Sequence, residues 1–279
     1  MKENLLRLIS ELTGKINPPM WTVFFRAFYS ALKEGKNYDE AKVIGQKQVD
    51  LITVQIGSEP YVPNSNSDYS MTGIPLLPNF GNQQSNALLL SQLACEMEKS
   101  FNESAQLNSY HILRFKKVQK ELTVTQREIA LRWDDSKITP PGHLLSIVLH
   151  NTDDLNLIEK VIIGLNEAAV ACWALKYAIK QGRPEEMILA LYNEVFVPLI
   201  ATPRHPSCPS GHSTFSGVVA EICKNLKNII DPITNLTYSD FNAIAEEASI
   251  SRVYGGIHYH KDCDFGMKLG RAIGKRLAA

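Results

Sequence analysis

Amphipathic periodicity typical of α-helices runs through most of this 279-residue chain, and it constrains the fold more than any other feature. Apolar residues recur at intervals of three and four, which gathers them on one face of a helix. No segment shows convincing alternation of apolar and polar residues, the pattern of a half-buried strand. The sequence therefore predicts an all-α helical bundle, with helices over residues 21–33, 86–99, 118–133, 157–180, 185–197, 213–226 and 241–252.

A stretch crowded with Pro, Gly, Asn and Ser divides the N-terminal part of the chain from the rest. Residues 57–84 are predicted to form a long ordered loop, and residues 1–56 before it a helical hairpin. Since nothing in the loop forces a domain boundary, we expect a single all-α domain over residues 1–279, with these two segments as an accessory part. The first 130 residues carry no motif that indicates a function.

The charge balance excludes a general attraction to polyanions. Lysine plus arginine number 29, as do aspartate plus glutamate, so any affinity for anions must be local. The start of the chain carries Glu3 and Glu11 where a signal peptide needs an apolar core. The most apolar stretch, 161–175, contains Asn166 and Glu167 and is too short for a membrane span. We expect a cytoplasmic protein that binds neither nucleic acid nor a membrane.

Cysteine usage argues against structural cross-links. The cysteines are odd in number and far apart, and no two form a C-x-x-C pair, so neither a disulfide framework nor a zinc knuckle is indicated. We expect reduced and mostly buried thiols at Cys95, Cys172, Cys208, Cys223 and Cys263.

The first of three motifs with chemical content is Lys176-x6-Arg183-Pro184. Seven residues are close to two helical turns, so both cations are predicted to project from one face of a helix that Gly182 and Pro184 end near Arg183. Such a pair suits an oxyanion. A solvated basic helix end is the alternative, because Lys and Arg are common in last turns.

The second motif is Pro-Ser-Gly-His over residues 209–212, directly before a helical pattern. A Ser-Gly turn that opens a helix offers unpaired backbone N–H groups, a hydroxyl and the positive end of the helix dipole, which together suit an anion. His212 then lies where a proton is needed. Ordinary N-capping by Ser210 or Ser213, with a histidine at the surface, is the alternative explanation of this motif.

The third motif is Ser251-Arg252-x5-His258-x3-Asp262. Residues 255 and 256, both glycine, are predicted to break one helix, and His258 to open the next. Asp262 would then lie at i+4 and hold the second imidazole nitrogen, as for a nucleophilic or ligating histidine. A purely structural Asp–His pair is the alternative. The remaining histidines, among them His143 and His260, are expected to be structural or at the surface.

Together, K-x6-RP, PSGH and SR-x5-H-x3-D resemble the three-part signature of the type 2 phosphatidic acid phosphatase and vanadium haloperoxidase superfamily. The resemblance covers roughly residues 131–274, the expected catalytic core, and includes every signature position. It implies a helical bundle with one site for phosphate or vanadate. By this resemblance the oxyanion is bound by Lys176, Arg183, Ser210, Gly211 and Arg252, and the catalytic residues are His258, His212, Asp262 and Lys176.

Context favours the soluble haloperoxidase branch of this superfamily, because neither membrane spans nor a signal peptide are found. Trp173, one turn before Lys176, also looks like that branch, as do T-P-P-G-H at residues 139–143 after Trp133-Asp134 and the ending Y-G-G-I-H…L-G-R-A-I-G. His205 stands where bromoperoxidases of the family resemble this sequence and chloroperoxidases carry phenylalanine, which favours bromide or iodide. A histidine that only hydrogen-bonds the loop backbone is the alternative.

The resemblance implies vanadate as cofactor, with His258 as the protein ligand to vanadium. His212 would shuttle protons and Lys176 would polarise bound peroxide, so that halide is oxidised by hydrogen peroxide. The alternative is a soluble acid phosphatase, a phosphomonoesterase without a cofactor, in which His258 attacks phosphorus and forms a phosphohistidine. A third hypothesis assigns the chain to another class of function: a degenerate member of the superfamily that only binds an anion or serves as a structural subunit.

Cys208, just before the PSGH motif, departs from many relatives. A thiol beside a peroxide-using centre would risk oxidation, which favours the phosphatase alternative. In either case the expected partners are small molecules, peroxide and halide or a phosphate ester. The resemblance is also compatible with a homodimer.

Overall fold

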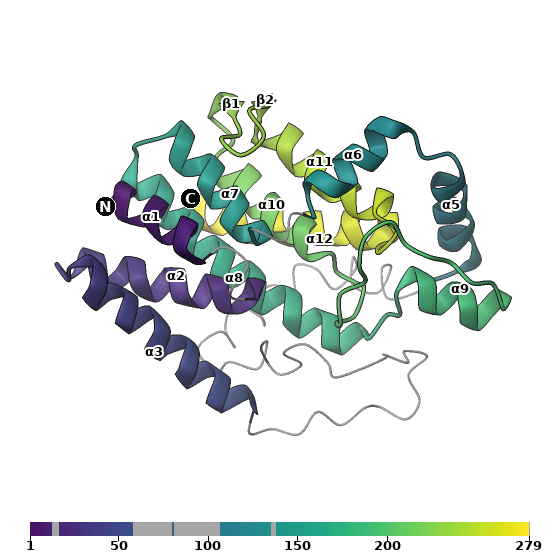
Figure 1. The fold of residues 1–279 in the computed structure, drawn as a ribbon, viewed down its shortest axis with the longest axis horizontal. Coiled ribbons are helices and arrows are strands. Elements are labelled where there is room, and N and C mark those ends of the chain that lie inside the picture. Colours follow the sequence, from purple (N-terminus) through teal and green to yellow (C-terminus); the bar gives the residue numbers. More distant parts are fainter. Residues whose placement is uncertain (13–16, 58–79, 81–106, 135–137, 279) are drawn as a thin grey trace.

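A computed structural model describes residues 1–12, 17–57, 80, 107–134 and 138–278. These residues form a helical bundle with one small hairpin, so the all-α prediction is confirmed (Figure 1). The hairpin pairs β1 (Lys227–Ile230) antiparallel with β2 (Thr237–Asp240). The helices are α1 (Lys2–Leu12), α2 (Pro18–Lys33), α3 (Tyr38–Gly57), α5 (Ser109–Lys120), α6 (Val124–Arg132), α7 (Pro140–Asn151), α8 (Leu155–Ile179), α9 (Pro184–Tyr192), α10 (Gly211–Ile222), α11 (Phe241–Tyr254) and α12 (His260–Ala278).

The helix predicted over residues 118–133 is wrong, because the chain breaks there into α5 and α6. Thr123 begins α6 with a capping box: its side chain accepts from the N–H of Gln126, and the Gln126 side chain accepts from the N–H of Thr123. The T-x-x-Q sequence carries this signal. The helix predicted over 86–99 lies outside the described residues, as does the predicted loop 57–84 apart from Gly57 and Phe80.

Two other boundaries differ from prediction for local reasons. The helix expected to reach residue 197 ends at Tyr192, where Asn193 takes a left-handed conformation with φ 50°. The helix expected to reach residue 226 ends at Ile222, and the hairpin β1–β2 follows. Strands of four residues are too short for alternation to distinguish them from a loop.

Helix α8 lies at the centre of the bundle and packs against α2, α7, α10 and α12 (Figure 1). It is apolar around most of its circumference, as expected for a helix buried on all sides. One continuous set of buried side chains joins α1 and α2 to α7, α8, α10, α11 and α12. Among the described helices, none is long and apolar enough to cross a membrane.

Helices α10 and α12 pack with their backbones in contact, and glycines make this approach possible. A Cβ atom on Gly270 would lie 2.2 Å from the carbonyl oxygen of Thr214, and one on Gly266 would lie 2.6 Å from that of Ser210. From the other side, a Cβ atom on Gly217 would lie 2.9 Å from the carbonyl oxygen of Met267. This contact fixes the first turn of α12 against the N-terminus of α10.

We expect Gly270→Ala to lower the free energy of unfolding by about 2 kcal/mol, because overpacking against backbone cannot be relieved by a side-chain rotation. The sign of this change in the free energy of unfolding is informative, since alanine forms helices better than glycine by about 1 kcal/mol and would otherwise stabilise the protein. Urea unfolding measures the difference, and Lys268→Ala, an exposed change on the same helix, is the control. A Gly270→Ala protein as stable as the wild type would show that the helices do not pack this closely.

Candidate active site

The candidate site is built around the N-terminus of α10, which begins at Gly211 as the second motif predicts. Ser210 is the N-cap, and its hydroxyl oxygen accepts from the N–H of Ser213 at 3.4 Å. The N–H of Ser210 in turn donates to the carbonyl oxygen of Asp262 at 2.9 Å. The second and third motifs are therefore joined directly through the backbone.

Gly211 is not required by packing. A Cβ atom there would meet no described atom closer than 3.8 Å, at the ring of Phe215, with Trp173 at 3.9 Å. Its N–H belongs to the first turn of α10, where backbone donors have no partner within the helix. A glycine at this position keeps space beside those donors, which a ligand can use.

The prediction that Lys176 and Arg183 share one helix is wrong. Helix α8 ends at Ile179, and Lys180 follows it with a left-handed φ of 52°. Arg183 lies beyond this break, as the N-cap of α9. Both cations nevertheless turn to the same loop, because the carbonyl oxygen of Pro206 accepts from Lys176 at 2.8 Å and from Arg183 at 3.4 Å.

Lys176 is fully buried, and loop carbonyls surround its ammonium group. Nζ donates to the carbonyl oxygens of Pro206 at 2.8 Å, Ser207 at 3.1 Å and Pro209 at 2.5 Å. Burial lowers the pKa of Lys176 to about 8. In this arrangement Lys176 fixes the course of the loop and places a positive charge behind it.

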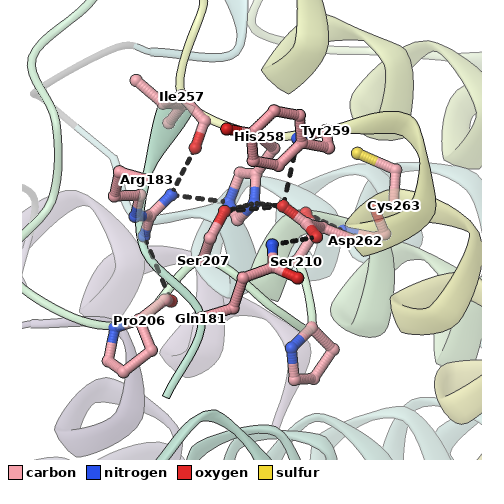
Figure 2. A network of polar contacts seen from close by, with 12 residues as sticks. Gln181, Arg183, Pro206, Ser207, Ser210, Ile257, His258, Tyr259, Asp262 and Cys263 are labelled. Atoms are coloured by element: carbon pink, nitrogen blue, oxygen red, sulfur yellow. Dashed lines mark hydrogen bonds and ion pairs between the residues drawn. The ribbon is translucent and has the colours of Figure 1, made fainter. Parts of the chain in front are cut away.

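Arg183 bridges the loop and the third motif (Figure 2). Its Nη1 donates to the carbonyl oxygen of Ile257 at 2.7 Å and lies 3.0 Å from Nε2 of His258. Nη2 lies 3.0 Å from Nδ1 of His205, and Nε donates to the carbonyl oxygen of that residue. Since a guanidinium group only donates, Nε2 of His258 must accept. The proton of this neutral imidazole is therefore on Nδ1.

Nδ1 of His258 points at two oxygen atoms, Oγ of Ser207 and Oδ2 of Asp262, each at 3.3 Å. Burial, followed by the charge of Arg183, lowers the pKa of His258 to about 3. Burial alone would raise the pKa of Asp262, but hydrogen bonds from His258 and Ser207 hold it below its usual range. The pair therefore consists of a neutral imidazole and a carboxylate. The prediction that His258 opens a helix is wrong, because α12 starts two residues later, at His260.

Arg252 reaches the site from the last turn of α11 and is held by α6. Its Nη2 donates to the carbonyl oxygen of Ala130 at 2.9 Å, and Nε donates to Oγ of Ser251 at 2.9 Å. Asp134, just past α6, lies 3.6 Å from Nη1. Burial lowers the pKa of Arg252 to about 10, so its guanidinium remains charged at neutral pH.

His212 is oriented by the same end of α6. Its Nε2 lies 3.0 Å from the carbonyl oxygen of Trp133, which can only accept, so Nε2 carries the proton and Nδ1 is the acceptor nitrogen of the neutral ring. Burial, followed by the charge of Arg252, lowers the pKa of His212 well below its usual value. The Trp133 ring stacks on His143, which pairs with Asp231 at 2.9 Å and has the structural role expected of it.

Two residues of this network were missed by sequence reasoning, Ser207 and Gln181. Ser207 lies in the loop before the second motif and Gln181 at an unspecified position within the first, and both donate to the carboxylate of Asp262. The available signal was indirect: a buried carboxylate needs several donors, and short polar residues beside a motif can supply them.

The loop also buries Cys208, whose side chain is inaccessible. Burial, followed by the charge of Asp262, raises the pKa of this thiol well above its usual value. Because the thiolate is the reactive form, a protonated buried thiol is poorly oxidised. The other described cysteines, Cys172, Cys223 and Cys263, are also free and buried.

Known proteins similar to this chain share its architecture. Residues 225–279 match the family model of the VCPO second helical-bundle domain. A bacterial vanadium-dependent iodoperoxidase structure aligns with a TM-score of 0.63 and 23% identity, over 88% of this chain and 71% of the other. The apo structure of a bacterial vanadium-dependent chloroperoxidase aligns with a TM-score of 0.56 and 11% identity, over 85% of this chain and 72% of the other. The holo structure aligns with a TM-score of 0.57 and 12% identity, over 85% of this chain and 71% of the other.

A search of curated proteins found no match. At identities of 23% and below, the structural likeness shows the fold. The chain therefore has the helical-bundle fold of the vanadium-dependent haloperoxidases, so the fold that the resemblance implies is confirmed.

Proposed function

We propose that this protein is a vanadium-dependent haloperoxidase-like enzyme, which binds vanadate and oxidises halide with hydrogen peroxide. The observation that carries the proposal is the state of His258. Its Nδ1 is directed at Asp262 and its Nε2 accepts from Arg183, so the lone pair of a neutral imidazole lies inside a buried, positively charged site, where a bond to vanadium would replace the hydrogen bond from Arg183. A histidine in this state can bind the metal of an oxyanion as a ligand.

The donor set fits vanadate. Two buried guanidinium groups, a buried ammonium group and a helix N-terminus supply positive charge, and Gly211 leaves space at that terminus. The residues that would hold the oxyanion are Lys176, Arg183, Ser210, Gly211 and Arg252, with His258 as the ligand to vanadium. Of these, Lys176 would act mainly by charge and through the loop, because its donors already bind carbonyl oxygens.

Bound vanadate would supply a Lewis-acidic centre that activates hydrogen peroxide for attack by halide. The chain itself handles protons and orientation. His212 accepts a proton at Nδ1, since its Nε2 is committed to Trp133. Arg252 is held by Ala130 and Asp134 and so presents its charge without rotating away.

We extend the proposal to bromide or iodide as the halide. The resemblance to the family favours these halides, because His205 stands where its bromoperoxidases resemble this sequence. Its ring packs against Trp173 with 5.0 Å between centroids, and its Nδ1 lies beside Arg183. The higher identity to a structure described as an iodoperoxidase, 23% against 11% and 12%, supports the same choice. The buried, protonated Cys208 also removes the objection from thiol oxidation.

The direct test is halogenation of a phenol dye with hydrogen peroxide and either bromide or iodide, with and without added orthovanadate. We expect turnover only with vanadate, and none in His258→Ala, because the ligand to vanadium is lost. His150→Ala, which removes an exposed histidine at the end of α7, is the matched control. Hydrolysis of p-nitrophenyl phosphate without halogenation would overturn the proposal in favour of the phosphatase alternative.

His212→Ala separates proton transfer from anion binding. We expect halogenation to slow by roughly 10²–10⁴-fold, the usual contribution of a positioned acid–base group. The affinity for inorganic phosphate, measured by calorimetry, should stay near the wild-type value, because His212 is not among the proposed oxyanion ligands. Loss of phosphate binding in this variant would contradict the role assigned to it.

The neutral state of His258 also predicts how stability depends on pH. Because the pKa of His258 falls from 6.5 to about 3 on folding, the unfolded chain binds a proton below pH 6.5 that the folded chain does not. The free energy of unfolding should therefore fall as the pH drops below 6.5.

The matched variant is His258→Gln, whose amide N–H can still donate to Asp262. We expect it to reduce the slope between about pH 5 and pH 6 by about 1.4 kcal/mol per pH unit. Urea unfolding at several pH values measures this slope. An unchanged slope would mean that His258 is protonated in the folded protein.

A further inference from the structure

The carboxylate of Asp262 is held by side chains at positions that none of the three motifs specifies (Figure 2). Oγ of Ser207 donates to Oδ2 at 2.6 Å, and Nε2 of Gln181 donates to Oδ1 at 2.7 Å. The N–H of Tyr259 also donates to Oδ2, at 3.0 Å. All three side chains of this network, Gln181, Ser207 and Asp262, are buried.

We infer that Ser207 and Gln181 are positioning residues for His258: they hold Asp262 in one orientation at Nδ1 and thereby, together with Arg183 at Nε2, fix which ring nitrogen of His258 carries the proton. Their side chains contact Asp262 and His258 rather than the cations proposed to bind the oxyanion. The inference rests on the proposed function only for its turnover readout, because the state of the ring can be measured independently.

The two donors are needed because the terminal torsion of an aspartate is only weakly restricted. The backbone N–H of Tyr259 binds Oδ2 and does not reach Oδ1. Gln181 supplies a partner for Oδ1, and Ser207 adds a second, shorter bond to Oδ2. With a donor on each oxygen, rotation of the carboxylate would break at least one buried hydrogen bond, which is costly.

Ser207 also acts on His258 directly. A hydroxyl group has one proton, and that of Ser207 goes to Asp262, so the lone pairs of its Oγ are available to Nδ1 of His258. At 3.3 Å the contacts of Nδ1 with Ser207 and Asp262 are each long, so neither is strong alone. Together they present only acceptors to Nδ1, which excludes the tautomer that lacks a proton there.

The backbone fixes both positioning residues. The N–H of Ser207 donates to the carbonyl oxygen of Gln181 at 2.9 Å, and the carbonyl oxygen of Ser207 accepts from Lys176. Oε1 of Gln181 is buried and has no hydrogen-bond partner among the described residues. A buried amide with one unsatisfied oxygen lowers the stability of the fold, so the contribution of Gln181 to the site lies in its bond to Asp262.

The test uses Ser207→Ala, Gln181→Met and the double variant. Ser216→Ala is the matched control, because it removes a buried hydroxyl that donates only to its own helix, at Ser213. Gln181→Met keeps the side-chain length and also removes the unsatisfied oxygen, so it should fold even if Ser207→Ala does not.

The first readout is the tautomer of His258 at neutral pH, from ¹⁵N NMR of histidine-labelled protein. Signals of His258 are assigned by their loss in His258→Gln. We expect the wild type and Ser216→Ala to show a proton on Nδ1 alone, and the double variant, in which Arg183 remains but Asp262 has lost two donors, to show a measurable fraction of the second tautomer. A single Nδ1–H tautomer in all of these proteins would overturn the inference, whether or not the protein halogenates.

The second readout is turnover. Each single variant should lower kcat by roughly 10–100-fold, the usual effect of losing a group that orients a metal ligand. Affinity for inorganic phosphate should stay near that of the wild type, and Ser207→Thr, which restores the hydroxyl, should recover part of kcat. Equal kcat in Ser207→Ala, Gln181→Met and Ser216→Ala would also refute the role.

Discussion

The hydrogen bonds to Asp262 are the interaction on which the rest of the site depends. A carboxylate this deeply buried is stable only if several donors replace the water it has lost. Those donors come from the α8–α9 connection, from the loop before α10 and from the start of α12. In addition, the backbone oxygen of Asp262 binds the N-cap of α10. One residue thus joins segments that are distant in sequence, and the ring of His258 takes its orientation from that junction.

The donors of the buried cations are satisfied mainly by uncharged groups, which supports the affinity for anions that we propose. Lys176 is surrounded by carbonyl oxygens, and Arg183 by carbonyl oxygens and imidazole nitrogens. Arg252 faces a carbonyl oxygen, a hydroxyl and the half-exposed Asp134 at 3.6 Å. Dipoles satisfy the donors without cancelling the charge. The site therefore keeps a net positive potential in a place from which water is largely excluded, and that potential favours an oxyanion.

Much of this arrangement could be predicted from the sequence, and the exceptions have physical causes. Helices α2, α8 and α11 follow their periodicity, and α10 starts where the Ser-Gly turn indicates. The position of Arg183 could not be derived, because the left-handed Lys180 ends α8 early and no sequence pattern marks a lysine in that conformation. The roles of Ser207 and Gln181 could not be predicted for a different reason, since they depend on a tertiary contact with Asp262.

The enclosure of Lys176 has a consequence for chemical labelling. Because burial is what lowers the pKa of Lys176, the amine is shielded from acylating reagents in the folded protein. It is fully buried, and its nitrogen must leave three carbonyl oxygens before a reagent can approach. The rate at which Lys176 is acylated therefore reports how often the loop at residues 206–209 opens, which makes this lysine a built-in probe of local unfolding beside the site.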